Sequence, residues 1–123
     1  MIVAVGIDLV ELGRVRRAWE AHGERFVRRC FTDAEAAAAR GRVDPVPALA
    51  ARFAAKEAFQ KTWPETLSWR DVGVVNAAGG APRLAFSERV TRRMAAEGWR
   101  AHVSLTHARE HAAAVVVLER LAS

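Results

Sequence analysis

Hydrophobic residues dominate the first stretch of the chain, and their spacing predicts a buried strand over residues 2–11. The segment reads IVAVGIDLVE and is rich in β-branched side chains, which favour strands. Side chains alternate along a strand, so the even-numbered and odd-numbered positions lie on opposite faces. The even face holds Ile2, Ala4, Gly6 and Asp8, and the odd face holds Val3, Val5, Ile7 and Leu9. The small residues on the even face leave room for another element to approach Asp8.

A helical period follows the first strand. Residues 12–22 form the first expected helix, with Gly23 as a stop, and residues 24–31 form a second helical piece. The sequence TDAE at 32–35 has the spacing of a capping box before an Ala-rich run that ends at Gly41. We therefore expect short helices between the first strand and the long helix described next.

The longest expected helix lies in the middle of the chain. Pro47 suits its first turn, and Pro64 cannot continue it, so the helix ends near Trp63. About sixteen residues at 1.5 Å per residue give a length of about 24 Å. This helix is long enough to cross a small sheet.

The rest of the chain alternates between strands and one helix. The expected strands are 69–75, 82–86, 102–107 and 112–119, and the expected helix is 87–98. The sequence AAGG between the first two of these strands indicates a hairpin. We predict a single α+β domain over residues 1–123, with a mostly antiparallel sheet packed against helices in the order β-α-α-α-β-β-α-β-β.

The amino-acid composition limits the kinds of partner that the protein can bind and the cellular compartment in which we expect it. The net charge of +5 and the pI of about 10.9 favour an acidic partner, such as an acidic protein, nucleic acid, an anionic membrane or a phosphorylated substrate. The single Cys30 excludes an internal disulfide and a multi-Cys zinc site. No segment reaches the roughly 18 consecutive apolar residues of a membrane span, and the start lacks a cationic leader. We expect a cytoplasmic protein without a membrane partner.

Two carboxylates carry most of the chemical information. An ionised Asp8 in an apolar strand needs a partner, although it also fits a strand-end residue that caps the next helix. Glu57 lies in the middle of the long helix. If this helix lies on the first strand, the two carboxylates meet and repel unless a cation neutralises them. Mg²⁺ is the natural cation, because it binds one or two carboxylates and completes its shell with water and phosphate oxygens.

The long helix also holds the only two lysines among nineteen basic residues. Lys is a compact point charge and Arg is a planar fork, so a pair of lysines suits a phosphate site. Arg52 and Lys56 form one basic line on the helix, and Lys61 lies one turn beyond Glu57. The plain alternative is an exposed Glu57–Lys61 pair, which stabilises a helix by only a few tenths of a kcal/mol.

Three of the four histidines lie close together near the end of the chain, which raises the question of a zinc site. In a strand His102 faces the same way as Ser104 and Thr106, whereas His107 faces the other way. The imidazoles of His102 and His107 therefore do not converge as zinc requires. Two interpretations remain: the hydroxyl and imidazole groups bind a phosphate-rich ligand, or they form a polar strand face.

An Arg-rich segment covers residues 14–29. Its members are Arg14, Arg16, Arg17, Arg25, Arg28 and Arg29, with Trp19 and Phe26 interleaved. Lines of Arg with aromatic anchors bind acidic helices or nucleic acid. A solvated helix face is the alternative.

Three motifs together give the chain a specific resemblance. They are GIDLVELGRV at 6–15, RFAAKEAFQK at 52–61 and HVSLTH at 102–107. In their order and approximate spacing, the chain resembles the holo-[acyl-carrier-protein] synthase group of the 4'-phosphopantetheinyl transferase superfamily. The resemblance implies transfer of 4'-phosphopantetheine from coenzyme A to a Ser of an apo acyl carrier protein, with release of adenosine 3',5'-bisphosphate, in support of fatty acid biosynthesis. It also implies a Mg²⁺ cofactor and a homotrimer whose sites lie where two subunits meet.

The resemblance also implies roles for individual residues. Asp8 and Glu57 match the magnesium ligands, and Lys61 matches the lysine that contacts the transferred phosphate, so Glu57 and Lys61 are the expected catalytic residues. The expected coenzyme A contacts are Arg52, Lys56, Lys61, Gly80, Pro82, His102, Thr106 and His107. The expected contacts with the carrier protein are Arg14, Arg17, Arg25, Phe26 and Arg28.

Two segments depart from the pattern of this family. TWPETLSW at 62–69 replaces a Gly-rich turn, and AGGAP at 78–82 replaces an Asn-Gly-Lys-Pro hairpin. Two rival functions remain: a basic nucleic-acid-binding module, and a homologue that binds coenzyme A without transfer. We expect no nucleic acid partner, because Asp8 and Glu57 would repel a phosphate backbone in the absence of a metal.

Overall fold

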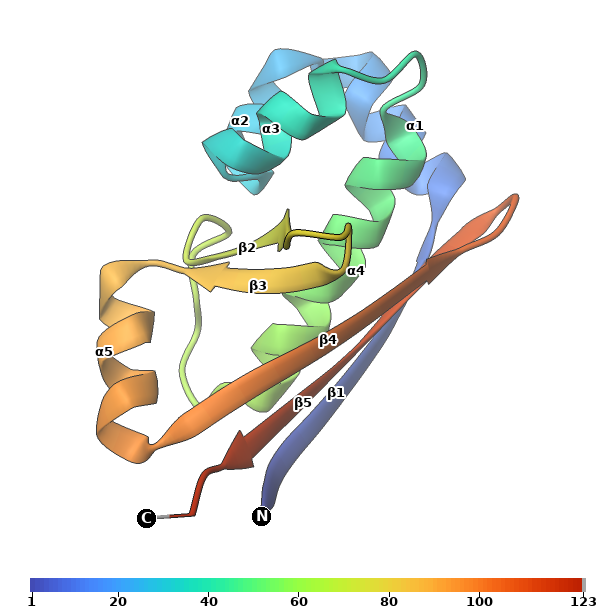
Figure 1. Cartoon of the computed structure of the whole chain (residues 1–123). Coiled ribbons are helices and arrows are strands. Elements are labelled where there is room, and N and C mark those ends of the chain that lie inside the picture. Colours follow the sequence, from blue (N-terminus) through green and yellow to red (C-terminus); the bar gives the residue numbers. More distant parts are fainter. Residues whose placement is uncertain (123) are drawn as a thin grey trace.

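A long central helix lies across a three-stranded antiparallel sheet (Figure 1). The computed structural model describes residues 1–122. The strands are β1 Ile2–Glu11, β2 Val72–Asn76, β3 Pro82–Phe86, β4 Trp99–His107 and β5 His111–Arg120. The helices are α1 Leu12–His22, α2 Glu24–Cys30, α3 Asp33–Arg40, α4 Val46–Thr62 and α5 Glu88–Glu97. The predicted α+β class and the order of the elements are confirmed, except that four helices lie between β1 and β2 where the predicted order has three.

The strands form two sheets. The larger sheet has the order β1-β5-β4, so that β1 and β4 are its two edges, and the smaller sheet is the hairpin β2-β3. Gly79 and Gly80 turn the hairpin with positive φ angles of 89° and 88°, a backbone conformation that favours glycine. The AAGG sequence predicted this turn correctly.

Helix α4 packs against the even face of β1. A Cβ atom added at Gly6 would lie 2.0 Å from the carbonyl oxygen of Ala58, so only glycine permits this approach. Ala54, Ala55 and Ala58 of α4 are fully buried. The prediction that small residues near Asp8 admit another element is confirmed, and α4 is that element.

The odd face of β1 differs from the prediction of a buried strand. Ile7 is 66% exposed and Leu9 is 67% exposed in the single chain. In the register of the sheet, Ile7 lies opposite Val115 of β5, and Val5 lies opposite Val117, which extends the apolar surface across both strands. One face of the larger sheet is therefore covered by α4, and the other is apolar and open.

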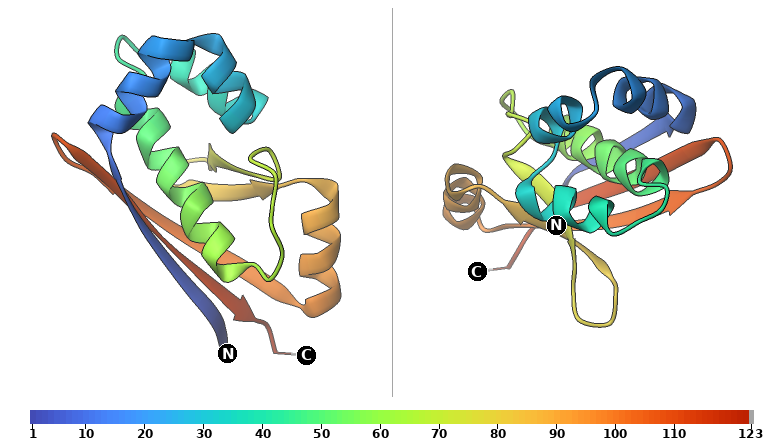
Figure 2. Two further views of the ribbon diagram at one scale, coloured as in Figure 1. Left: turned by 180° about the vertical axis from the view of Figure 1, so that it is seen from behind. Right: turned by 90° about the horizontal axis from the view of Figure 1, so that it is seen from above.

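The remaining helices gather at the ends of α4. Figure 2 shows α1, α2 and α3 over the N-terminal end of α4, with α5 beside its other end. The capping box predicted at the start of α3 is present: Thr32 and Glu35 each accept a hydrogen bond from the backbone of the other. Ser87 occupies the N-cap position of α5, but its hydroxyl donates to Asp71 at 2.7 Å and does not cap the helix. Within residues 1–122, no helix is both long and apolar enough to cross a membrane.

Candidate active site

The exposed edge of the larger sheet brings Asp8 of β1 together with Lys61 of α4. The Lys61 ammonium donates to the backbone carbonyl of Ile7 at 2.7 Å and lies 3.4 Å from the Oδ1 atom of Asp8. The Asp8 side chain is 18% exposed, and that of Lys61 is 52% exposed. Because the pair is open to water, it contributes little to stability, and both groups stay accessible to a ligand.

Glu57 lies one turn before Lys61 on α4 and is half-buried. Among the ion pairs of residues 1–122, Lys61 pairs with Asp8 and does not pair with Glu57. The plain alternative of an i,i+4 Glu57–Lys61 pair is therefore not the arrangement found. The prediction that Asp8 and Glu57 meet required the long helix to lie on the first strand, and α4 does pack against β1.

Lys56 takes a position that the sequence did not predict. It is 2% exposed, and its ammonium lies 2.7 Å from the Oε1 atom of Glu35. The ammonium also donates to the carbonyl of Trp69 at 2.8 Å and to the carbonyl of Val72. Burial lowers the pKa of Lys56, and the adjacent Glu35 carboxylate opposes this shift. The predicted phosphate contact of Lys56 finds no support in this geometry, because its donors are occupied within the protein.

Glu35 is the site-adjacent residue that sequence reasoning missed. Its Oε2 atom accepts from the backbone N–H of Val74 at 2.9 Å, and its Oε1 atom accepts from the N–H of Thr32 at 3.0 Å. The capping-box sequence predicted the Thr32 contact but not the ion pair with Lys56. Together these contacts join α3, α4, β2 and the loop that follows α4 at one buried point. We call the ion pair between Glu35 and Lys56 the buried clamp.

Arg52 is also buried, so the predicted basic line of Arg52 and Lys56 is not a solvent-exposed face. One guanidinium nitrogen of Arg52 donates to the carbonyl of Ala48 at 3.2 Å. Its Nε atom has no hydrogen-bond partner among residues 1–122. Burial lowers the pKa of this guanidinium, and the nearby Glu35 carboxylate opposes the shift.

The late strand shows the predicted alternation. His102 and Thr106 lie on the open face of the sheet, because they pair in register with Val117 and Ala113, and His107 lies on the opposite face. The ring of His102 lies 2.7 Å from a carboxylate oxygen of Glu119, and this contact lowers the pKa of Glu119. No group of three or more His, Cys, Asp or Glu side chains in residues 1–122 is placed to hold a metal.

A single chain does not bring all the predicted site residues together. Asp8 lies on β1 and His102 lies on β4, which are opposite edges of one sheet. Gly80 and Pro82 lie on the β2-β3 hairpin, and Pro82 and His102 line one cavity of about 500 Å³. Within one copy, His102, Gly80 and Pro82 are therefore separated from Asp8.

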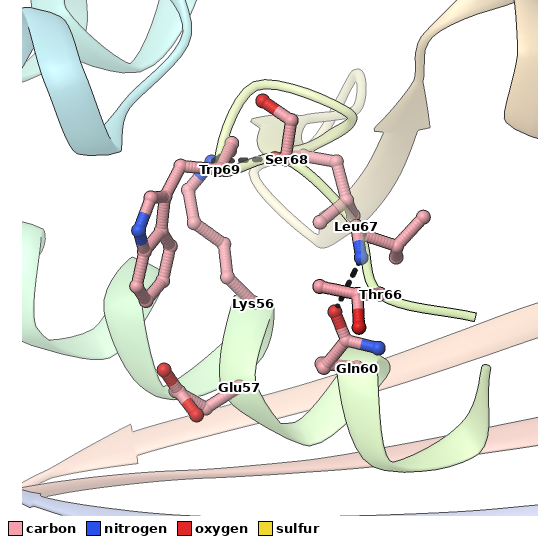
Figure 3. Close-up of a pocket in the computed structure, with 8 residues that line it drawn as sticks. Lys56, Glu57, Gln60, Thr66, Leu67, Ser68 and Trp69 are labelled. Carbon is pink, nitrogen blue, oxygen red and sulfur yellow. Dashed lines mark hydrogen bonds between the residues drawn. The ribbon is translucent and has the colours of Figure 1, made fainter. Parts of the chain in front are cut away.

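Two further cavities flank α4. The first, of about 250 Å³, is lined by residues that include Glu57, Leu67 and Trp69 (Figure 3). The second, of about 370 Å³, is lined by residues that include Arg25, Phe26 and Trp69. We call these the Glu57 cavity and the Arg25 cavity.

The predicted carrier-binding residues lie on α1 and α2. Phe26 is half-buried and packs edge-to-face on Phe31, with ring centroids 5.6 Å apart. The exposed members of the predicted set are Arg14, Arg17, Arg25 and Arg28. Phe26 lines one cavity with Arg25 and another with Arg14, and carrier binding by these residues stays a prediction.

The open ammonium–carboxylate pair of Lys61 and Asp8, with the Glu57 carboxylate one helical turn away, is the kind of arrangement that binds phosphate groups and divalent cations. The family model of the 4'-phosphopantetheinyl transferase superfamily matches residues 4–116, and the chain belongs to that superfamily. The chain is 58% identical to the holo-[acyl-carrier-protein] synthase of Thermus thermophilus, over 97% of this chain and 94% of that protein. It is 51% identical to the Deinococcus radiodurans protein of the same name, over 98% of this chain and 96% of that protein.

Solved structures carry the same fold. The holo-[acyl-carrier-protein] synthase of Neisseria meningitidis matches with a TM-score of 0.90 and 31% identity, over 98% of this chain and 100% of that chain. The Bacillus anthracis enzyme, solved in complex with CoA (3',5'-ADP), matches with a TM-score of 0.82 and 33% identity, over 98% of this chain and 99% of that chain. The resemblance drawn from the three motifs is confirmed.

Proposed function

We propose that this protein transfers the 4'-phosphopantetheine of coenzyme A to a Ser of an apo acyl carrier protein, in support of fatty acid biosynthesis. The observation that carries this proposal is the Lys61 ammonium held between the Ile7 carbonyl and Asp8, one helical turn from Glu57, in a member of this superfamily. The serine oxygen forms a bond to the phosphorus next to pantetheine. The bond from that phosphorus to adenosine 3',5'-bisphosphate breaks, and the serine proton leaves to a base.

Asp8 and Glu57 are the proposed magnesium ligands. Their donor set suits Mg²⁺, because two carboxylates leave room for the water and phosphate oxygens that complete an octahedral shell. Bound Mg²⁺ supplies charge neutralisation for the phosphate oxygens. Lys61 orients Asp8 through the 3.4 Å contact and presents its remaining donors to the transferred phosphate. Glu57 is the proposed acceptor of the serine proton.

The nucleotide end of coenzyme A has a separate set of proposed contacts. Arg52 belongs to this proposed set, although its Nε atom is enclosed within the chain. The remaining proposed residues are Gly80, Pro82, His102, Thr106 and His107. Since Asp8 and His102 lie on opposite edges of the sheet, one copy of the chain presents only part of this set beside the carboxylates.

A homotrimer with sites between subunits completes the proposal. The open apolar face of β1 and β5 is unusual for a monomer, because large exposed apolar patches mark interaction surfaces. Ile7 and Leu9 of this face stand beside Asp8 on the same strand, so a second copy that covers them would lie next to the carboxylates. Such a copy would bring its own His102 edge toward Asp8.

The acidic carrier protein docks, in this proposal, on the surface formed by Arg14, Arg17, Arg25, Phe26 and Arg28. Complementary charge speeds encounter, and the aromatic anchor supplies buried contact area. A cytoplasmic location and the absence of nucleic acid and membrane partners remain predictions of this proposal.

The proposal is tested by incubating the protein with coenzyme A, Mg²⁺ and apo acyl carrier protein and weighing the carrier protein by mass spectrometry. The expected result is a mass gain of one phosphopantetheine, which a chelator abolishes. An unchanged carrier protein together with tight coenzyme A binding would favour the homologue without transfer. Binding of DNA or RNA with a steep salt dependence would favour the nucleic-acid module.

A further inference from the structure

Trp69 is the one residue of the described chain that lines both the Glu57 cavity and the Arg25 cavity. It lies in the loop between α4 and β2, where this sequence departs from the pattern of the family. In Figure 3 its indole stands on the side of Glu57, while Leu67 and Thr66 form the facing wall. The side chain is half-buried, so part of it remains open to a ligand.

Trp69 is held from two directions. Its ring stacks on Phe53 of α4, with centroids 4.9 Å apart and an angle of 29° between the planes. Its carbonyl accepts a hydrogen bond from the Lys56 ammonium at 2.8 Å, and Lys56 is paired with Glu35 in the buried clamp. A half-exposed aromatic side chain that is fixed in this way can position a ligand without losing much conformational entropy.

The two cavities have different chemistry. Apart from Glu57 and the buried Lys56, whose ammonium is paired with Glu35, the Glu57 cavity is lined by neutral groups, among them Gln60, Thr66 and Leu67. Such a lining suits the uncharged amide arm of coenzyme A beyond the reacting phosphate. The Arg25 cavity combines Arg25 and Arg29 with aromatic rings, which suits an acidic protein surface with an apolar anchor.

We propose that Trp69 is a shared substrate-positioning residue, with one part of its indole against the pantetheine arm of coenzyme A and another part against the docked carrier protein. This inference rests on the proposed function. A common wall fixes the distance between the serine hydroxyl and the phosphorus it attacks, and such alignment is a large source of rate acceleration. Lys56 and Glu35 are positioning residues in this scheme, because they hold the backbone of Trp69.

The first test observes Trp69 in the wild-type protein. The chain has four tryptophans, so protein labelled with 5-fluorotryptophan gives four fluorine resonances, and Trp69→Phe assigns that of Trp69. We expect this resonance to shift when coenzyme A is added alone and when apo carrier protein is added alone. The buried Trp63 serves as the internal control and should shift much less with either ligand.

Adenosine 3',5'-bisphosphate identifies which part of coenzyme A makes the contact. It lacks the pantetheine arm, so it should leave the Trp69 resonance nearly unshifted at saturation. An equal shift with this ligand would overturn the assignment of the arm to the Glu57 cavity. A Trp69 resonance that responds to only one of coenzyme A and carrier protein, or to neither, would overturn the shared wall.

Equilibrium binding supplies the second test, with single-cavity controls. Trp69→Ala should weaken coenzyme A and a Ser→Ala carrier protein by roughly fivefold to tenfold each, as expected for loss of an aromatic contact. Leu67→Ala should weaken mainly coenzyme A, and Arg25→Ala mainly the carrier protein. Trp69→Phe, which keeps the stack on Phe53, should retain most of both affinities and serves as the binding variant if Trp69→Ala does not fold.

The outcomes separate this inference from the proposed function. If wild-type protein modifies the carrier protein but Trp69→Ala binds both partners as well as wild type, the inference fails and the function stands. If wild-type protein binds neither coenzyme A nor carrier protein, the function fails, and the inference fails with it.

Discussion

Lys56 and Lys61 lie on the same helix, yet their ammonium groups have opposite surroundings. Lys56 is enclosed with Glu35 and two backbone carbonyls, whereas Lys61 is 52% exposed beside Asp8. A buried charge must be fully partnered, because the cost of removing it from water is several kcal/mol. An open charge gains little from its partner and remains available to a ligand. We therefore assign Lys56 to the fold and Lys61 to the reaction.

The largest expected effect falls on the buried clamp. Lys56→Met should lower the free energy of unfolding by about 3–5 kcal/mol, because it leaves the carboxylate of Glu35 buried without its cation. Glu35→Gln combined with Lys56→Met should recover much of this loss, since neither charge then remains. Denaturant unfolding of the two single variants and the double variant measures the coupling. Simple addition of the single losses would contradict a direct pair.

The second-largest expected effect concerns Asp8 and Glu57, the two carboxylates of the candidate active site. Asp8→Ala and Glu57→Gln should each lower kcat by ~10²-fold or more, because several kcal/mol of charge stabilisation depends on the metal site. Neither change should lower the unfolding free energy as Lys56→Met does, because both side chains lie partly in water. The assay varies Mg²⁺ concentration for each variant. Full activity of either variant in chelator would rule out the two-carboxylate site.

A smaller effect is expected for the surface that is proposed to bind the carrier protein. Its arginines are expected to speed the encounter with the carrier protein and to take no part in the chemical step. Arg14→Glu should raise KM for the carrier protein by roughly tenfold while leaving coenzyme A binding nearly unchanged, because Arg14 is exposed on α1 and does not line the Glu57 cavity or the cavity of Pro82 and His102. Added salt should reduce kcat/KM of wild type more than that of the variant. If Arg14→Glu instead weakens coenzyme A binding, the surface is misassigned.

The smallest expected effect concerns residues 69–72, whose first and last carbonyls accept hydrogen bonds from Lys56. In the sequence, Asp71 lies between Trp69 and Val72, whose carbonyls accept hydrogen bonds from the Lys56 ammonium. Hydrogen bonds from Arg89 lower the pKa of Asp71 from 3.8 to about 2. The Asp71 carboxylate therefore stabilises the fold above about pH 4, and this contribution is lost as the pH falls toward 2. Between about pH 5 and pH 2, wild type should lose about 1 kcal/mol more unfolding free energy than Asp71→Asn. Equal losses would mean that this contact is not linked to stability.

Much of the fold follows from local patterns in the sequence. The β-branched residues of 2–11 predict β1, and the small Ala4 and Gly6 predict the close approach of another element, which is α4. The capping box at 32–35 and the hairpin at Gly79 and Gly80 also depend on neighbouring residues. The strand, the capping box and the hairpin are predictable because their interacting groups lie close together along the chain. The approach to β1 was predictable only as space beside small residues, since Ala58, which fills it, lies far from Gly6 in the sequence.

The buried clamp and the open face of the sheet were not predictable in the same way. Glu35 meets Lys56 only because α3, α4 and β2 converge, and no local pattern encodes that convergence. One signal for the burial of Lys56 was present: α4 is apolar on nearly all sides, with Ala54, Ala55 and Ala58 around it, and such helices are buried all round. The exposure of Ile7 depends on what covers the sheet in an assembly, which the strand pattern does not specify.

The most direct test of the division between the two lysines is the turnover number of Lys61→Ala at saturating coenzyme A, Mg²⁺ and apo carrier protein. We predict a fall in kcat of ~10²-fold or more, the scale for loss of one preorganised charge contact, with a stability loss within about 1 kcal/mol. Lys61→Arg should recover only part of the rate, because a planar fork does not replace a compact ammonium. A wild-type kcat in Lys61→Ala would contradict the assignment of Lys61 to the reaction.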